Sequence, residues 1–191
     1  VRAGWTPLSC EAIFFRAQRR AGRPASVGTT LPALLEALRL DGQPPETDWP
    51  YRPAAPANDA AWSPPAQTGD VHRRAGEPAT PDWTRLIARL DEGRPVILLI
   101  TLSRSFYAPD PEGVVRPAQT ESPDPALRHA VLAVAHGAVG DEPAVLVRNS
   151  WGGAWGHDGH AWLTAGFLGP RLFGMALLDE DDDVPSRSDA A

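Results

Sequence analysis

The chain has 191 residues, a net charge of −6 and 42% hydrophobic residues, values typical of one globular domain or of two small halves packed together. This composition excludes a coiled coil, a collagen-like fibre and a wholly disordered chain. Apolar runs such as Val96–Ile100 are far shorter than the roughly 18 residues that a membrane span needs. We therefore expect no membrane partner.

The charge is distributed unevenly along the chain. Five consecutive acidic residues occupy positions 179–183, so the remainder is nearly neutral. Without a basic face there is nothing to follow a phosphate backbone, and nucleic acid is not an expected partner.

Cys10 is the single cysteine, which excludes an internal disulfide and favours a reducing, cytoplasmic location. The chain begins with valine and shows no signal peptide. These features favour an excised domain or a processed chain, with other domains of a longer chain as possible partners.

Helical patterns fill the first part of the chain. One helix is predicted over residues 10–20, ended by Gly22 and Pro24, and Thr30 is a candidate N-cap for a second. The second helix has an apolar stripe and closes at Asp41-Gly42; the stripe consists of Leu31, Leu34, Leu35 and Leu38.

A Pro-rich segment over residues 43–81 separates these helices from the rest of the chain. It is predicted to be a long loop, for which Trp49, Tyr51 and Trp62 are the available anchors. Asp82 then caps a third predicted helix that ends at Gly93.

Strand patterns dominate the remainder. They are predicted at 96–102, 129–135, 144–148, 160–164 and 171–178. Helices followed by strands indicate an α+β fold. We expect a single domain over residues 1–180, with a helical lobe at about 1–90 and an antiparallel β-sheet or barrel lobe at about 91–180. Residues 181–191 are expected to form an acidic flexible tail.

Three residues could support nucleophilic catalysis. Cys10 lies in the first turn of a predicted helix, where backbone N–H groups and the helix dipole stabilise a thiolate. His129 opens an apolar strand, and Asn149 follows another. Each residue type alone is more often structural: a buried cysteine, a packed histidine, a turn asparagine.

Together these residues resemble the papain-like (C1 family) cysteine peptidases, in a divergent, bacterial-looking form. The chain order Cys, His, Asn matches, with about 120 and then about 20 residues between them. Residues 149–159 read Asn-Ser-Trp-Gly-x-x-Trp-Gly-x-x-Gly, which is close to the family's asparagine motif. The segments Ser9-Cys10, His129–Gly137 and Trp49-Pro50-Tyr51 resemble its nucleophile helix, histidine strand and interdomain crossing.

The resemblance implies a two-lobed papain-like fold and hydrolysis of a peptide or protein substrate through an acyl-thioester. Cys10 would be the nucleophile, His129 the general base and acid, and Asn149 the residue that orients the imidazole. Trp151 would shield the His–Asn hydrogen bond from water. No metal or organic cofactor is implied.

Three departures from the family affect the expected site. The family's oxyanion glutamine is missing, since Gly4 stands at its offset, and Arg2 is the candidate substitute donor. Glu11 replaces the tryptophan that usually follows the nucleophile; it is expected to be solvated or paired with an arginine. Leu127 and Ala130 match positions near the usual S2 pocket, which hints at an apolar preference.

Alternative functions stay open at this stage. The missing glutamine and Glu11 favour a papain-like binding or scaffold module with weak or no catalysis. The same triad could instead serve a dedicated single-site processing peptidase or a transpeptidase. A metal site at residues 157–160, His-Asp-Gly-His, is disfavoured because these residues fall in a turn of the family motif.

Overall fold

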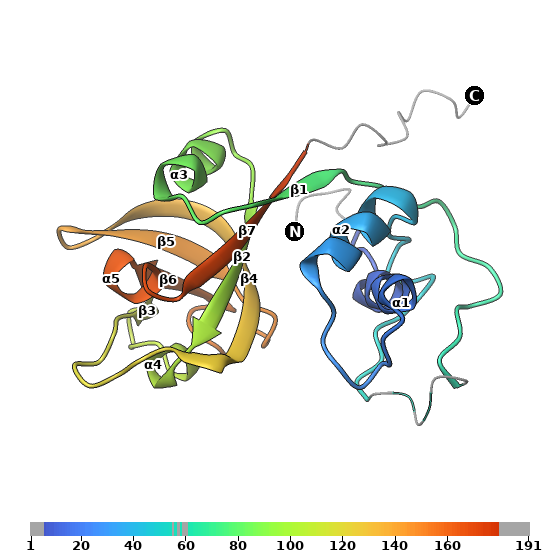
Figure 1. Cartoon of the computed structure of the whole chain (residues 1–191), viewed down its shortest axis with the longest axis horizontal. Helices are drawn as coiled ribbons and strands as arrows, with labels where there is room; N and C mark the ends of the chain where they lie inside the picture. The colour runs from blue at the N-terminus through green and yellow to red at the C-terminus, as the bar shows by residue number, and fades with distance from the viewer. Residues whose placement is uncertain (1–5, 55, 57, 59–60, 180–191) are drawn as a thin grey trace. The chain divides into compact units, whose positions relative to one another are not determined.

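The computed structural model describes residues 6–54, 56, 58 and 61–179, which divide into two compact units. The first unit contains the described residues up to Glu77 together with Asp179, and the second is Pro78–Leu178. Figure 1 labels their elements. Two predicted features, Arg2 and the acidic tail at 181–191, lie outside the described residues.

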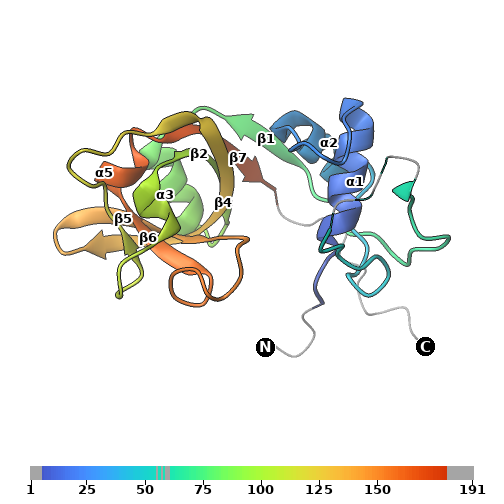
Figure 2. The same cartoon turned by 90° about the horizontal axis from the view of Figure 1, so that it is seen from below.

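The first unit is built on two helices that lie against each other, α1 (Cys10–Ala21) and α2 (Leu31–Leu40) (Figure 2). The prediction of both helices is confirmed. Helix α1 ends at Gly22, whose φ of 60° is the left-handed conformation that glycine adopts at helix ends. Helix α2 begins after Thr30, as predicted, but the Thr30 side chain makes no capping hydrogen bond.

A long segment after α2 supplies the aromatic part of this unit's interior. Trp49 and Trp62 are 4% and 2% exposed, and both ring systems contact Phe15, at centroid distances of 5.3 and 4.9 Å. The prediction of these two anchors is confirmed. The third predicted anchor is wrong, because Tyr51 is 62% exposed.

The second unit contains a mixed sheet that is mostly antiparallel, in agreement with the predicted α+β class. Within the described residues its strand order is β1-β7-β2-β4-β5-β6-β3. The β3–β6 pairing is parallel, whereas β2–β4, β2–β7, β4–β5 and β5–β6 are antiparallel. The strands are β1 (Gly76–Ala79), β2 (Val96–Leu102), β3 (Val114–Val115), β4 (Asp124–Val139), β5 (Glu142–Arg148), β6 (His160–Thr164) and β7 (Leu172–Leu178).

The strand predictions differ from the structure mainly at element ends. Strands β2 and β6 have the predicted bounds, whereas β4 is longer than the predicted 129–135. Strands β1 and β3 were not predicted, because four and two residues are too few to show a clear alternation.

Helix α3 (Trp83–Asp91) covers part of this sheet (Figure 1). Its N-cap is Asp82, as predicted, whose side chain accepts a hydrogen bond from the Arg85 amide. Leu86 and Leu90 are buried in one core together with the inward residues of β2. The expected helical lobe at about 1–90 includes this helix, but the structure places it in the second unit, because that is where its apolar face is buried.

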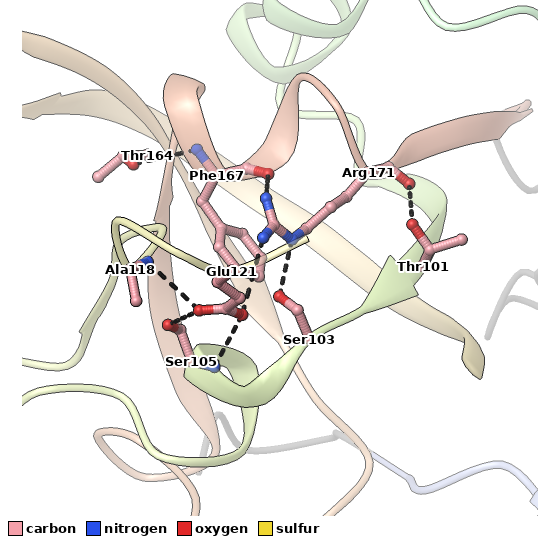
Figure 3. Close-up of polar contacts among 8 residues, drawn as sticks. All are labelled: Thr101, Ser103, Ser105, Ala118, Glu121, Thr164, Phe167 and Arg171. Carbon is pink, nitrogen blue, oxygen red and sulfur yellow. Dashed lines mark hydrogen bonds and ion pairs between the residues drawn. The ribbon is translucent and has the colours of Figure 1, made fainter. Parts of the chain in front are cut away.

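Two short helices, α4 (Arg104–Tyr107) and α5 (Ala165–Leu168), are joined by a buried arginine, Arg171. Arg171 is 2% exposed. Its Nε donates to Ser103 Oγ at 2.9 Å and its Nη1 donates to the Phe167 carbonyl at 2.8 Å. Its guanidinium lies 4.0 Å from the centroid of the Phe167 ring, and Nη2 lies 3.7 Å from Glu121 Oε1 (Figure 3).

Glu121 is the counter-charge of Arg171 and is itself buried, with a side chain 8% exposed. Its carboxylate accepts hydrogen bonds from the Ser105 amide at 3.0 Å, the Ser105 hydroxyl and the Ala118 amide at 3.3 Å (Figure 3). Burial acts to raise the pKa of Glu121, but the hydroxyls of Ser103 and Ser105 and these backbone amides outweigh it and lower the pKa from 4.5 to about 2.

This lowered pKa predicts how stability depends on pH. Since the pKa of Glu121 is lower in the folded state, its contribution is complete above about pH 4.5 and is lost as pH falls towards 2. We expect Glu121→Gln to reduce the free energy of unfolding at pH 7 by about 3 kcal/mol. It should also flatten the loss of stability between pH 4.5 and 2. Urea unfolding at a series of pH values measures both effects.

Glu92→Gln is the matched control for this experiment. It removes one negative charge from the same unit, but the Glu92 side chain is 52% exposed and its ion pairs with Arg89 and Arg94 lie at the surface. We expect a change within about 0.5 kcal/mol. Equal effects of the two substitutions would contradict the special role of Glu121.

Candidate active site

His129 and Asn149, which are 20 residues apart in the sequence, form a direct hydrogen bond in the second unit. His129 Nε2 and Asn149 Oδ1 are 2.8 Å apart. His129 lies on β4 and Asn149 directly follows β5, and these two strands pair in the sheet. The pairing of two neighbouring strands therefore brings these predicted site residues together.

A second hydrogen bond to Asn149 Oδ1 shows which nitrogen of His129 carries the proton. Asn149 Oδ1 also accepts a hydrogen bond from the Ser150 amide at 2.8 Å, which identifies this atom as the oxygen rather than the amide nitrogen. A carbonyl oxygen only accepts, so His129 Nε2 must be the donor. In the neutral imidazole, Nδ1 is then unprotonated and can accept a proton.

Aromatic side chains surround the imidazole of His129. The Trp151 ring lies 5.0 Å from it, centroid to centroid, and the fully buried Phe106 ring lies 5.7 Å from it in an edge-on arrangement. The indole N–H of Trp155 donates to the Phe106 carbonyl at 2.8 Å, which ties Phe106 to the turn after Asn149. Trp151 thus packs beside His129, an arrangement that supports its predicted shielding role.

The turn after Asn149 depends on glycine. The Asn149 amide donates to the Gly159 carbonyl at 2.9 Å, so the turn folds back onto the asparagine. Gly156 has a φ of +59°, and a Cβ built at this position would lie 2.2 Å from the carbonyl oxygen of His160. Only glycine fits there.

Cys10 lies in the first unit, at the first residue of α1, and is exposed. Every polar group of the preceding residue, Ser9, has a hydrogen-bond partner. The Ser9 hydroxyl accepts from the Ala12 amide at 3.0 Å and donates to the Trp49 carbonyl at 2.5 Å. The Ser9 amide donates to the Pro44 carbonyl, and its carbonyl accepts from Gln43 Nε2. Cys10 therefore starts the helix from a fixed point, where the helix N-terminus favours an anion.

Glu11 is buried, which neither of the expected arrangements described. Its side chain is directed into the first unit, where Oε1 accepts from the Trp62 indole at 2.7 Å and Oε2 accepts from the Arg52 backbone amide at 3.3 Å. The residue as a whole is 7% exposed. Sequence reasoning missed Trp62 as its partner because the two residues are 51 positions apart.

The donors to an oxyanion are only partly within the described residues. Cys10 is described, at the first residue of α1, whereas Arg2 and Gly4 lie outside the described residues. Gln43 does not replace the missing glutamine, since its side-chain amide donates to the Ser9 carbonyl at 3.1 Å. In a trans peptide that carbonyl points away from the following N–H, here the amide of Cys10.

Leu127 and Ala130, the predicted substrate-binding residues, are both exposed on β4. Ala130 directly follows His129 on the strand and so lies on the other face, whereas Leu127 lies in an irregular stretch, where the pairing with β2 shifts from Arg128 to Asp124. Their contact with a substrate stays a prediction.

The His157–His160 turn is closed by backbone hydrogen bonds between these two residues, at 2.8 and 3.0 Å. In the part of the chain that the structure describes, no three His, Cys, Asp or Glu side chains are grouped as a metal site. In the same described part, no helix has the length and apolarity needed to cross a membrane.

Comparison with known proteins identifies the family. A family model described as papain family cysteine protease matches residues 22–168, a range that contains His129 and Asn149 and begins after Cys10. Among solved structures, xylellain, a cysteine protease from Xylella fastidiosa, superposes with a TM-score of 0.73 at 21% identity, covering 90% of this chain and 69% of that one. The Carica candamarcensis cysteine protease CMS1MS2 gives 0.64 at 19% identity, covering 95% and 81%. These likenesses show the papain-like fold that the sequence predicted.

Two curated plant proteins match over shorter segments. A thiol protease aleurain-like protein of Arabidopsis thaliana is 48% identical over 50 residues, which are 26% of this chain and 13% of the relative. Cysteine proteinase 3 of Solanum lycopersicum is 43% identical over 61 residues, 31% of this chain and 16% of the relative. The matched segments thus span less than a fifth of either relative.

The capping role of Ser9 can be tested against that of Thr30. Ser9→Ala removes both the cap of α1 and the hydrogen bond to the Trp49 carbonyl, and we expect it to lower the free energy of unfolding by about 2 kcal/mol. Thr30→Ala should cost much less, because the Thr30 side chain makes no capping bond. Chemical unfolding of the two variants measures the difference, and a larger effect at Thr30 would contradict this assignment.

The need for glycine in the turn after Asn149 can be tested by comparing Gly156 with Gly153. Gly156→Ala places a methyl group against the His160 carbonyl, and we expect a loss of several kcal/mol, or a locally rearranged turn. Gly153→Ala is the control, because a Cβ there meets no atom within 4 Å. Thermal unfolding compares them; the reading of this turn is rejected if Gly156→Ala is as stable as Gly153→Ala.

Proposed function

Because the chain belongs to the papain family of cysteine proteases, we propose that it is a cysteine peptidase with Cys10 as nucleophile, His129 as general base and acid, and Asn149 as the residue that orients His129. The observation that carries the proposal is the hydrogen bond of 2.8 Å between His129 Nε2 and Asn149 Oδ1. It leaves Nδ1 as the proton acceptor, which is the arrangement that a thiol–imidazole pair needs.

The proposed reaction has two halves. In the first, the Cys10 thiol gives its proton to His129 Nδ1, and the thiolate attacks the carbonyl carbon of a peptide bond. The C–N bond then breaks, the departing amine takes the proton from Nδ1, and an acyl-thioester is left on Cys10. In the second half, water gives a proton to Nδ1 and attacks the carbonyl carbon of the thioester. The C–S bond then breaks, the acid is released, and Nδ1 returns the proton to the sulfur of Cys10.

The residues around the triad have supporting roles in this proposal. The Nε2–H···Oδ1 bond stabilises the imidazolium that forms when Nδ1 is protonated. Trp151, packed against His129, keeps water away from that bond. The Cys10 amide, together with Arg2, would donate hydrogen bonds to the oxyanion.

The finer assignments follow from the same premise. We propose an endopeptidase that acts on peptide or protein substrates in the cytoplasm without a metal or organic cofactor. Leu127 and Ala130 would favour an apolar substrate side chain. A single-site processing enzyme or a transpeptidase would form the same acyl-thioester and differ only in the substrate range or in the acceptor that attacks it.

The alternative that is not an enzyme is an inactive binding or scaffold module. One of its two arguments was a charge beside the nucleophile, at Glu11. That carboxylate is buried against Trp62, with hydrogen bonds from the indole and from a backbone amide, so it is not an exposed charge at the start of α1. The missing oxyanion glutamine still favours the scaffold, so the reactivity of Cys10 has to be measured directly.

The triad is tested by covalent labelling with an epoxide or vinyl-sulfone probe of cysteine peptidases, measured by intact mass. We expect wild type to be labelled once, Cys10→Ala not at all, and His129→Ala at a rate lower by about 100-fold or more. Asn149→Ala should fall between wild type and His129→Ala. His136→Ala is the matched control, since His136 is an exposed histidine of the same strand, hydrogen-bonded to Asp91.

A small alkylating agent separates an inaccessible site from an inactive one. If the wild-type chain resists the probe but Cys10 is alkylated quickly at pH 6, and slowly in His129→Ala, the triad is intact and the substrate site is narrow. If Cys10 reacts no faster than cysteine in a peptide at that pH, the activated pair does not exist and the scaffold alternative is correct.

A further inference from the structure

We propose that Glu121 and Arg171, neither of which touches the imidazole, are positioning residues for His129. Their buried contacts fix α4, and α4 places Phe106 against the rings of His129 and Trp151. This inference rests on the proposed function for its effect on catalysis, but its structural content concerns only the second unit.

Helix α4 cannot hold its own conformation. It has four residues, and isolated helices shorter than about 12 residues are unstable in water. Its N-cap, Ser103, makes no side-chain capping bond. The Ser103 hydroxyl instead accepts a hydrogen bond from Arg171 Nε at 2.9 Å. The usual local cap is thus replaced by a long-range one.

The next turn of the helix is held by the same pair. The Glu121 carboxylate accepts both the amide and the hydroxyl of Ser105, the residue directly before Phe106 (Figure 3). Arg171 holds the opposite side through Phe167, whose carbonyl it binds and whose ring it covers. The Phe167 ring in turn stacks on Phe106 at 6.4 Å. Phe106 is therefore fixed through its backbone and through its ring.

Phe106 transmits this constraint to the candidate site. It is fully buried, and its ring lies 5.7 Å from His129 and 5.4 Å from Trp151, edge-on to both. The imidazole can rotate about its outer side-chain bond, a torsion with broad minima. Packing on two sides limits that rotation to the orientation in which Nε2 points at Asn149. A displaced α4 would release one of those sides.

The charges of Glu121 and Arg171 set the directions of hydrogen bonds and do not only affect stability. Burying two charges costs free energy that their attraction only partly returns, so a buried ion pair is weak support for stability as such. The planar guanidinium, however, donates along fixed directions to Ser103 and Phe167. An apolar pair of similar size would fill the space without fixing the position of Ser103.

The experiment compares Glu121→Gln with the double variant Glu121→Gln/Arg171→Met. The single variant leaves a buried guanidinium without its counter-charge, whereas the double variant removes both charges and should recover much of the stability. If the pair positions His129, kcat for a peptide substrate falls about tenfold or more in both variants, while KM changes less than about twofold. Recovery of wild-type kcat in the double variant would refute the positioning role.

A second readout does not depend on catalysis. In histidine-labelled protein, the Nε2–H proton of His129, identified by its loss in His129→Ala, should exchange slowly with water because it is hydrogen-bonded to Asn149. We expect exchange to be faster by about tenfold in both variants and unchanged in Glu92→Gln. Wild-type exchange in the double variant would overturn the proposal. If either variant fails to fold, Ser103→Ala, which removes one hydroxyl from the network, should shift kcat and exchange in the same direction by a smaller factor.

The two readouts separate this proposal from the proposed function. A wild-type protein that neither reacts with the probe nor cleaves peptides would refute the peptidase, and Nε2–H exchange would still decide the role of Glu121. An active wild type, with normal kcat and normal exchange in the double variant, would refute the positioning role and leave the peptidase standing.

Discussion

The hydrogen bond between His129 and Asn149 depends on several features of the second unit. A distance of 2.8 Å between two side chains on neighbouring strands requires a fixed register of β4 against β5 and a turn that returns to Asn149. That turn requires Gly156, since the His160 carbonyl occupies the space of a side chain. The orientation of the imidazole requires packed aromatic rings beside it, which are supplied by Phe106 and Trp151.

The first unit applies a similar constraint to Cys10 by different means. Its helix begins at a serine whose hydroxyl, amide and carbonyl all have partners, three of them in the segment that follows α2. Glu11 then ties the same helix to Trp62, in a part of the chain without regular secondary structure. Hydrogen bonds to buried side chains thus hold a Pro-rich segment that would otherwise have no reason to be ordered.

Each unit contains a buried carboxylate, Glu11 in the first and Glu121 in the second. Glu11 stands where the family usually has a tryptophan, and its carboxylate accepts a hydrogen bond from the indole of Trp62. Glu121 and Arg171 form a buried pair, with Arg171 next to β7 and Glu121 shortly before β4. In each case a buried carboxylate is acceptable because several donors satisfy it.

The sequence by itself determined the helices that the structure has at Cys10–Ala21 and Leu31–Leu40 and the bounds of strands β2 and β6. Its motifs also indicated Cys10, His129 and Asn149, the residues that we propose as the triad. Local signals were sufficient there, since caps, glycine stops and periodicity act over a few residues. The tertiary structure alone decided the partner of Glu11, the burial of Arg171 and the unit to which α3 belongs. Glu11 and Trp62 are 51 positions apart, and Glu121 and Arg171 are 50 positions apart. Contacts at such separations follow from how the elements pack, and no local sequence pattern records them.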